Sequence, residues 1–98
     1  MTYYLSPEAE AELAEAVDFY ALNVSARVAG NFLAVFEQKA QLLVEFPRLG
    51  APTTKGRHLF PIGRYPYSIL YREVEGGIRI SAIAHHARRP KYWQKREP

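Results

Sequence analysis

The stretch YSILYREVEGGIRISAIAHH, from Tyr67 to His86, is the part of the chain that decides the fold. Two runs rich in β-branched and aromatic residues, Tyr67 to Val74 and Ile78 to His86, flank the sequence Glu75-Gly76-Gly77. Adjacent glycines accept the positive φ angles that tight hairpins need. The stretch therefore predicts two antiparallel strands joined by a hairpin turn.

Within the second of these strands, successive side chains are expected to point to opposite faces of the sheet. One face would carry Ile78, Ile80, Ala82, Ala84 and His86, and the other Arg79, Ser81, Ile83 and His85. The first face is mostly apolar, so we expect it to pack against helices while the opposite face stays free to bind a partner.

Two amphipathic helices are expected upstream of the hairpin. The first follows Ser6-Pro7, a capping residue and a proline suited to the first helical position. Its apolar positions have helical spacing: Ala9, Leu13, Ala16, Val17 and Tyr20. This spacing is expected to leave three acidic residues, Glu8, Glu10 and Glu12, on the solvent face.

The second helix is expected between the break at Asn23-Val24-Ser25 and Pro47. Its apolar stripe consists of Val28, Phe32, Val35, Phe36, Leu43 and Phe46. Two further strands are expected, Thr2 to Leu5 before the helices and Arg57 to Ile62 after them. We therefore predict a single α+β domain over residues 1–98, with a short N-terminal strand, a helical hairpin and a three-stranded antiparallel sheet in two layers.

Charge is unevenly distributed along the chain, although its net value is only +3. Up to Thr54 there are three basic and seven acidic residues, whereas from Lys55 onward there are ten basic and three acidic residues. The basic half predicts an anionic partner, either nucleic acid or an acidic protein segment. The residues expected to bind a target or partner are Arg57, Arg64, Arg72, Arg88, Arg89 and Trp93.

Several kinds of site are excluded or disfavoured by composition. The chain has no cysteine, so it has neither a disulfide nor a thiolate ligand. The adjacent His85 and His86 would point to opposite faces of a strand, which argues against a metal site, and no cofactor is expected. No signal-peptide pattern and no long apolar run is present, so we expect a cytoplasmic protein without membrane contact.

One set of side chains could support catalysis. Metal-free cleavage of RNA needs a base, an acid and a cation that stabilises the phosphorane. Carboxylates are scarce in the basic half, which leaves His85, Arg88 and Tyr92 as the candidate catalytic residues. The structural alternative for His85 is a strand-end histidine that only satisfies a hydrogen bond.

Three motifs occur in order along the chain: Phe46 to Gly50 (FPRLG), Tyr67 to Arg72 (YSILYR) and Ala84 to Trp93 (AHHARRPKYW). Together with the predicted element order, they resemble the ParE/RelE superfamily of toxins from type II toxin–antitoxin systems over nearly the whole chain. The resemblance implies a growth-inhibiting toxin that is neutralised by a cognate antitoxin, whose C-terminal segment wraps over the toxin. It also implies contact with operator DNA only through the antitoxin.

The superfamily has two functional branches. The RelE branch is a ribosome-dependent endoribonuclease that cleaves messenger RNA, and the ParE branch blocks DNA gyrase. RelE-like toxins commonly have an arginine where this chain has Ser68, and His86 stands at the position of a second catalytic arginine; only Tyr92 matches. The phrase formed by His85, Arg88, Pro90 and Trp93 looks more like the ParE side. The resemblance therefore favours a gyrase-binding toxin over a ribonuclease, and a module that only represses its own operon is a third alternative.

Overall fold

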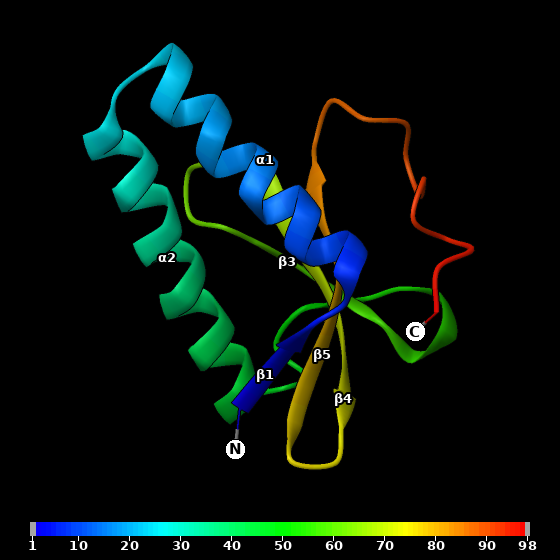
Figure 1. Cartoon of the computed structure of the whole chain (residues 1–98). Helices are drawn as coiled ribbons and strands as arrows, with labels where there is room; N and C mark the ends of the chain where they lie inside the picture. Colours follow the sequence, from blue (N-terminus) through cyan, green and yellow to red (C-terminus); the bar gives the residue numbers. More distant parts are fainter. Residues whose placement is uncertain (1, 98) are drawn as a thin grey trace.

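The computed structural model describes residues 2–97 (Figure 1). The elements in chain order are β1 (Thr2–Leu5), α1 (Pro7–Asn23), α2 (Ala26–Glu45), β2 (Ala51–Pro52), a 3-10 turn (Thr54–Gly56), β3 (His58–Pro61), β4 (Tyr67–Val74) and β5 (Gly77–His85). The two helices form a hairpin on one face of the sheet (Figure 1). The predicted two-layer α+β fold is therefore confirmed.

Both helices begin where their capping residues predict. The Ser6 side chain accepts a hydrogen bond from the Ala9 N–H at 3.1 Å, and Ser25 accepts one from Val28 at 3.1 Å. Most of the predicted apolar positions pack into the core. Glu12 is the exception to the expected acidic solvent face, because its side chain is only 9% exposed. Its position, three residues after Ala9, places it beside the apolar stripe of α1.

The sheet is larger than predicted. It has five strands in the order β1-β5-β4-β3-β2. The predicted antiparallel pairs β3–β4 and β4–β5 are present, while β1 runs parallel to β5 at one edge and the two-residue strand β2 extends the other edge. A parallel pair needs a long crossover connection, and here both helices and strands β2 to β4 lie between β1 and β5 in the sequence.

A β-bulge changes which side chains of β5 face the helices. Leu70 pairs with Ala82 and Tyr71 pairs with Ile80, so Ser81 has no partner on β4. Ile80 lies in the core under the helices, as predicted, and so does Ile83. Ala82 lies on the opposite face. The simple alternation expected for this strand is therefore wrong beyond Ser81, because one extra residue reverses the two faces.

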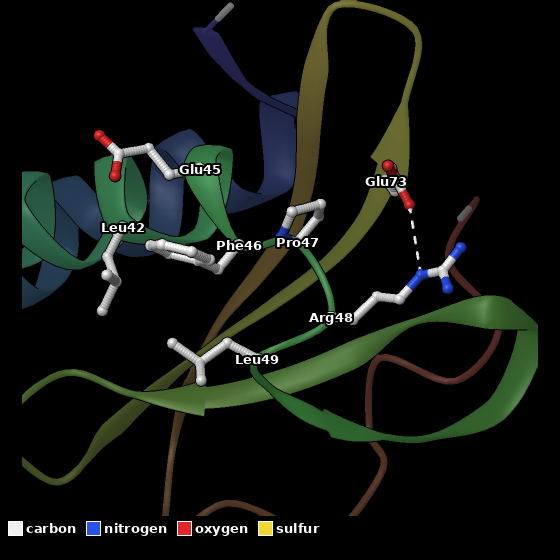
Figure 2. Close-up of a pocket in the computed structure, with 7 residues that line it drawn as sticks. All are labelled: Leu42, Glu45, Phe46, Pro47, Arg48, Leu49 and Glu73. Carbon is white, nitrogen blue, oxygen red and sulfur yellow. Dashed lines mark ion pairs between the residues drawn. The ribbon is translucent and has the colours of Figure 1, made fainter.

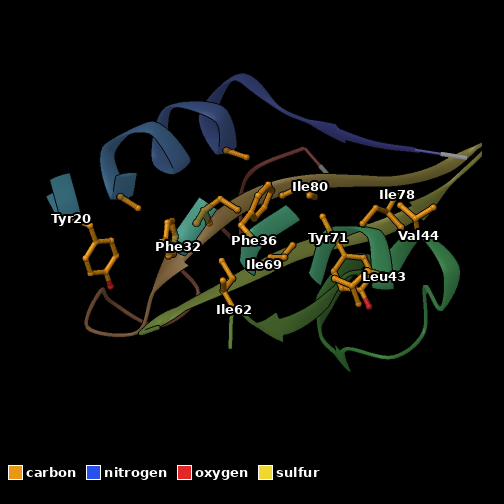
Figure 3. Packing of buried hydrophobic residues seen from close by; sticks show 14 of the residues in the cluster. Tyr20, Phe32, Phe36, Leu43, Val44, Ile62, Ile69, Tyr71, Ile78 and Ile80 are labelled. Carbon is orange, nitrogen blue, oxygen red and sulfur yellow. The ribbon is translucent and has the colours of Figure 1, made fainter. Parts of the chain in front are cut away.

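The main core lies between the helices and the sheet (Figure 3). Phe32, Phe36 and Leu43 of α2 are almost completely buried, and they share this core with Tyr71 and Ile80 of the sheet. Phe46, which the helical spacing predicts on the same stripe, is instead 56% exposed because α2 ends at Glu45. Among residues 2–97, no helix is long and apolar enough to cross a membrane.

The opposite face of the sheet carries a second, smaller core. Trp93 packs there with Leu70, Ala82 and Ala84, and its side chain is 3% exposed. Trp93 belongs to residues 86–97, which follow β5 and which we call the C-terminal segment. The expectation that this face of the sheet is free is therefore wrong, because the C-terminal segment covers part of it.

Candidate functional site

The C-terminal segment is held against α1 by the carboxylate of Glu12. Tyr92 donates its hydroxyl hydrogen bond to Oε2 at 2.7 Å, and Arg88 donates to the same oxygen at 3.2 Å. Arg96 donates to both oxygens, to Oε1 at 2.8 Å and to Oε2 at 3.0 Å. Oε1 also accepts the backbone N–H of Ile83 at 3.0 Å. Sequence reasoning missed this residue, although its spacing from Ala9 already placed it on the inner side of the helix.

This network perturbs the acidity of its members. Burial of Glu12 acts to raise the pKa of its carboxyl, but the hydrogen bonds from Arg96, Tyr92 and Ile83 outweigh burial and the net pKa is lowered. Burial and the neighbouring Glu12 carboxylate both raise the pKa of the Tyr92 hydroxyl. Tyr92 therefore stays protonated at neutral pH and acts as a hydrogen-bond donor.

Arg57 also holds the C-terminal segment in place, through hydrogen bonds to its backbone. Its side chain is fully buried and donates to the carbonyl oxygens of Thr54 at 3.3 Å, Arg96 at 3.1 Å and Gln94 at 3.0 Å. Its guanidinium also lies 5.2 Å from the centre of the Trp93 ring. Two members of the expected partner-binding set, Arg57 and Trp93, thus lie in the interior, where they position the C-terminal segment.

The other expected partner-binding residues are accessible but are not gathered in one place. Arg64 is exposed in the turn between β3 and β4, and Arg72 is partly buried on β4. Arg88 and Arg89 are exposed on the C-terminal segment. The structure therefore distributes these four arginines over three parts of the surface.

The candidate catalytic residues do share one groove. His85, Arg88 and Tyr92 line a hollow of about 440 Å³ beside the end of β5, together with Ser68 and His86. Ser68 Oγ lies 2.9 Å from His86 Nε2, so these two residues are in direct contact. His85 Nδ1 accepts the N–H of Ala87 at 2.9 Å, and its ring meets that of Tyr67 edge to face at 4.8 Å.

A second groove is apolar and lies at the end of α2 (Figure 2). It has a volume of about 640 Å³, and its lining residues are Leu42, Glu45, Phe46, Pro47, Arg48, Leu49 and Glu73. Phe46 and Leu49 are 56% and 49% exposed, and Arg48 and Glu73 form a loose ion pair of 4.0 Å at its rim. The groove is built mainly by the FPRLG motif. Exposed apolar surface of this kind is typical of a protein-binding site.

Metal binding finds no support in the geometry. Within residues 2–97, no group of three or more histidine, aspartate or glutamate side chains is arranged to hold a metal ion.

Comparison with known proteins places the fold. A search of curated proteins gave no match. A solved structure described as the chromosomal ParDE TA system from P. aeruginosa superposes with a TM-score of 0.74 at 22% identity, covering 87% of this chain and 95% of that one. A family model described as the ParE toxin of the type II toxin–antitoxin system parDE matches residues 3–90. Because that match spans most of the sequence, the chain belongs to the ParE toxin family.

Proposed function

We propose that this ParE-family toxin inhibits growth by binding and poisoning DNA gyrase in the cytoplasm, and that its cognate antitoxin neutralises it. The observation that carries the proposal is the bonding of Tyr92 to the buried Glu12 carboxylate. A tyrosine whose hydroxyl hydrogen is already donated to a buried carboxylate, and whose pKa is raised, is a poor proton donor or acceptor for a substrate. This arrangement favours a toxin that acts by binding over one that cleaves RNA.

The accessible arginines are the proposed contacts for the target. Arg88 and Arg89 are adjacent in sequence on the C-terminal segment, whereas Arg64, in the turn between β3 and β4, and Arg72, on β4, are proposed as separate contacts. Arginine is enriched at energetically important interface positions. Arg57 and Trp93 contribute indirectly, since they fix the backbone that carries Arg88 and Arg89.

The apolar groove at the end of α2 is the proposed binding site for apolar residues of the antitoxin. A toxin of a parDE system is paired with a cognate antitoxin, and the P. aeruginosa structure is described as such a system. Phe46 and Leu49 are large apolar side chains that are about half exposed. Covering them with an antitoxin segment would remove this surface from water.

A supercoiling assay tests the gyrase proposal. Purified toxin is added in stoichiometric excess to gyrase and relaxed plasmid, with and without equimolar cognate antitoxin. We expect loss of supercoiling that the antitoxin reverses. Gyrase activity that is unchanged by excess toxin would contradict the proposal.

One observation favours a second candidate, a ribosome-dependent endoribonuclease. His85, Arg88 and Tyr92 line the same groove, where they could act as base, phosphate-stabilising cation and acid. Primer extension on messenger RNA from cells expressing the toxin should then reveal new cleavage sites that Tyr92→Phe abolishes. Intact transcripts during growth arrest would remove this candidate, and absence of any growth arrest would leave operon repression as the role.

A further inference from the structure

A third hollow, on the C-terminal segment, is strongly cationic. It has a volume of about 450 Å³ and is lined by Lys55, Arg89, Lys91, Tyr92, Gln94 and Lys95, which we call the lysine pocket. Four of these six residues carry a positive charge, and none of them is acidic. They come from two distant parts of the chain, the 3-10 turn Thr54–Gly56 and the C-terminal segment. The fold therefore brings together like charges that repel one another.

Two of the pocket's lysines have an unusual backbone conformation. Lys55 has φ 61° and Lys91 has φ 59°. Among residues 2–97 these are the only positions other than glycine with positive φ. Side chains with a Cβ rarely adopt this region, and such strain concentrates at functional sites. That both strained residues are lysines lining one pocket indicates that the pocket has a function.

The buried Arg57 fixes the two walls of the lysine pocket relative to each other. One of its hydrogen bonds goes to the carbonyl of Thr54, directly before Lys55, and the other two go to Gln94 and Arg96, on either side of Lys95. The hydrogen bonds of Arg57 therefore fix the backbone that carries the cationic side chains. A backbone that is already fixed lowers the ordering cost of binding an anion.

We propose that the lysine pocket binds the phosphodiester backbone of a nucleic acid. Four cations spread over two segments suit consecutive phosphates of one strand. Bases are not the expected contact, because the Tyr92 ring is already occupied by the guanidinium groups of Arg88 at 3.7 Å and Arg96 at 5.1 Å. Binding is therefore sequence-independent and leaves the choice of operator to the antitoxin. This inference goes beyond gyrase inhibition, since it concerns the toxin and nucleic acid alone.

Fluorescence anisotropy with the full chain tests the proposal. The probes are a labelled 20-base-pair DNA duplex, a single-stranded RNA of equal length and a labelled poly-glutamate peptide. The test variant Lys55→Asn/Lys91→Asn removes two charges, and asparagine tolerates positive φ, so the fold is retained. The matched control Arg27→Gln/Lys39→Gln removes two charges from α2, which lies on the other side of the sheet.

We expect the test variant to weaken binding of DNA or RNA at least about tenfold and to reduce the slope of log K against log salt by about 1.4 to 1.8, as expected for two lost phosphate contacts. The control should change neither quantity by a comparable amount, and the tighter of the two nucleic acids identifies the natural source of the phosphates. Equal losses in both variants would indicate general attraction by net charge and would overturn the proposal. Binding of the peptide but of neither nucleic acid would also overturn it, in favour of an acidic protein partner.

Discussion

The Arg96 guanidinium spans both oxygens of the Glu12 carboxylate, at 2.8 Å and 3.0 Å, although the two residues are 84 positions apart in sequence. The Glu12 and Arg96 side chains are 9% and 21% exposed, so water screens this pair only weakly. The pair joins the first helix of the chain to nearly its last residue. The position of the C-terminal segment therefore depends on this carboxylate as well as on Arg57 and Trp93.

Replacing Glu12 with alanine is expected to destabilise the fold by about 3 to 5 kcal/mol, because Arg96 loses its carboxylate partner and the N–H of Ile83 its acceptor. The free energy of unfolding of the purified chain, measured by urea denaturation, checks this. Glu10→Ala, a change to an exposed residue of the same helix, should stay within about 0.5 kcal/mol of the original chain. Equal effects of the two substitutions would show that the network contributes little.

Acid should weaken the same network. The folded-state pKa of Glu12 lies below its ordinary value of 4.5, so its contribution to stability is present above about pH 4.5 and is lost as the pH falls through the lowered pKa. The unfolding free energy of the original chain should fall more steeply below pH 4.5 than that of Glu12→Gln, which has no carboxyl to protonate. Parallel pH profiles of the two proteins between pH 3 and 7 would contradict this.

The fold could be predicted largely because its local signals agree. Ser6 and Ser25 cap the helices as expected, and the predicted hairpin turn lies at Glu75 and Gly76, directly before β5. The β-bulge at Ser81 could not be predicted, because an extra residue in one strand depends on its pairing with β4 and leaves no periodic signal. From that residue onward, the assignment of faces was reversed.

Arg57→Lys tests the role of the buried guanidinium. Lysine keeps the charge but lacks the planar group that reaches three carbonyl oxygens, so we expect a loss of about 2 kcal/mol in unfolding free energy. The C-terminal segment should also detach more often, which limited trypsin digestion would detect as faster cleavage after Lys91 and Lys95. Arg64→Lys, at an exposed position, is the control and should change neither stability nor cleavage.

The candidate site was less predictable than the fold. Composition correctly marked the C-terminal half as basic, but it could not separate cations at the surface from cations in the interior. Arg57 donates hydrogen bonds to backbone carbonyls of residues up to 39 positions away in sequence. No local sequence pattern predicts contacts over such a separation. The position of Glu12, three residues after Ala9, predicts the inner side of α1, but its charge favoured the solvent face.

Phe46→Ser/Leu49→Ser tests the apolar groove. These exposed side chains contribute little to the core, so the toxin should stay folded while its affinity for the cognate antitoxin falls at least about tenfold, as measured by calorimetry. Leu22→Ser is the control, since Leu22 is 85% exposed near the end of α1 and lies outside the groove. If the antitoxin binds all three proteins equally, it does not occupy this groove.

Gly77→Ala tests the parallel pairing of β1 with β5. A Cβ at this position would lie 1.7 Å from the carbonyl oxygen of Thr2, its partner residue, so the two strands must move apart. We expect a loss of about 2 to 4 kcal/mol in unfolding free energy and faster amide hydrogen exchange in β1. Gly30→Ala is the opposite case, because nothing lies within 4 Å of its added Cβ in α2. Alanine there should raise the unfolding free energy by about 0.5 to 1 kcal/mol, so the two glycines should respond with opposite signs. A stable Gly77→Ala variant with unchanged exchange in β1 would contradict the pairing.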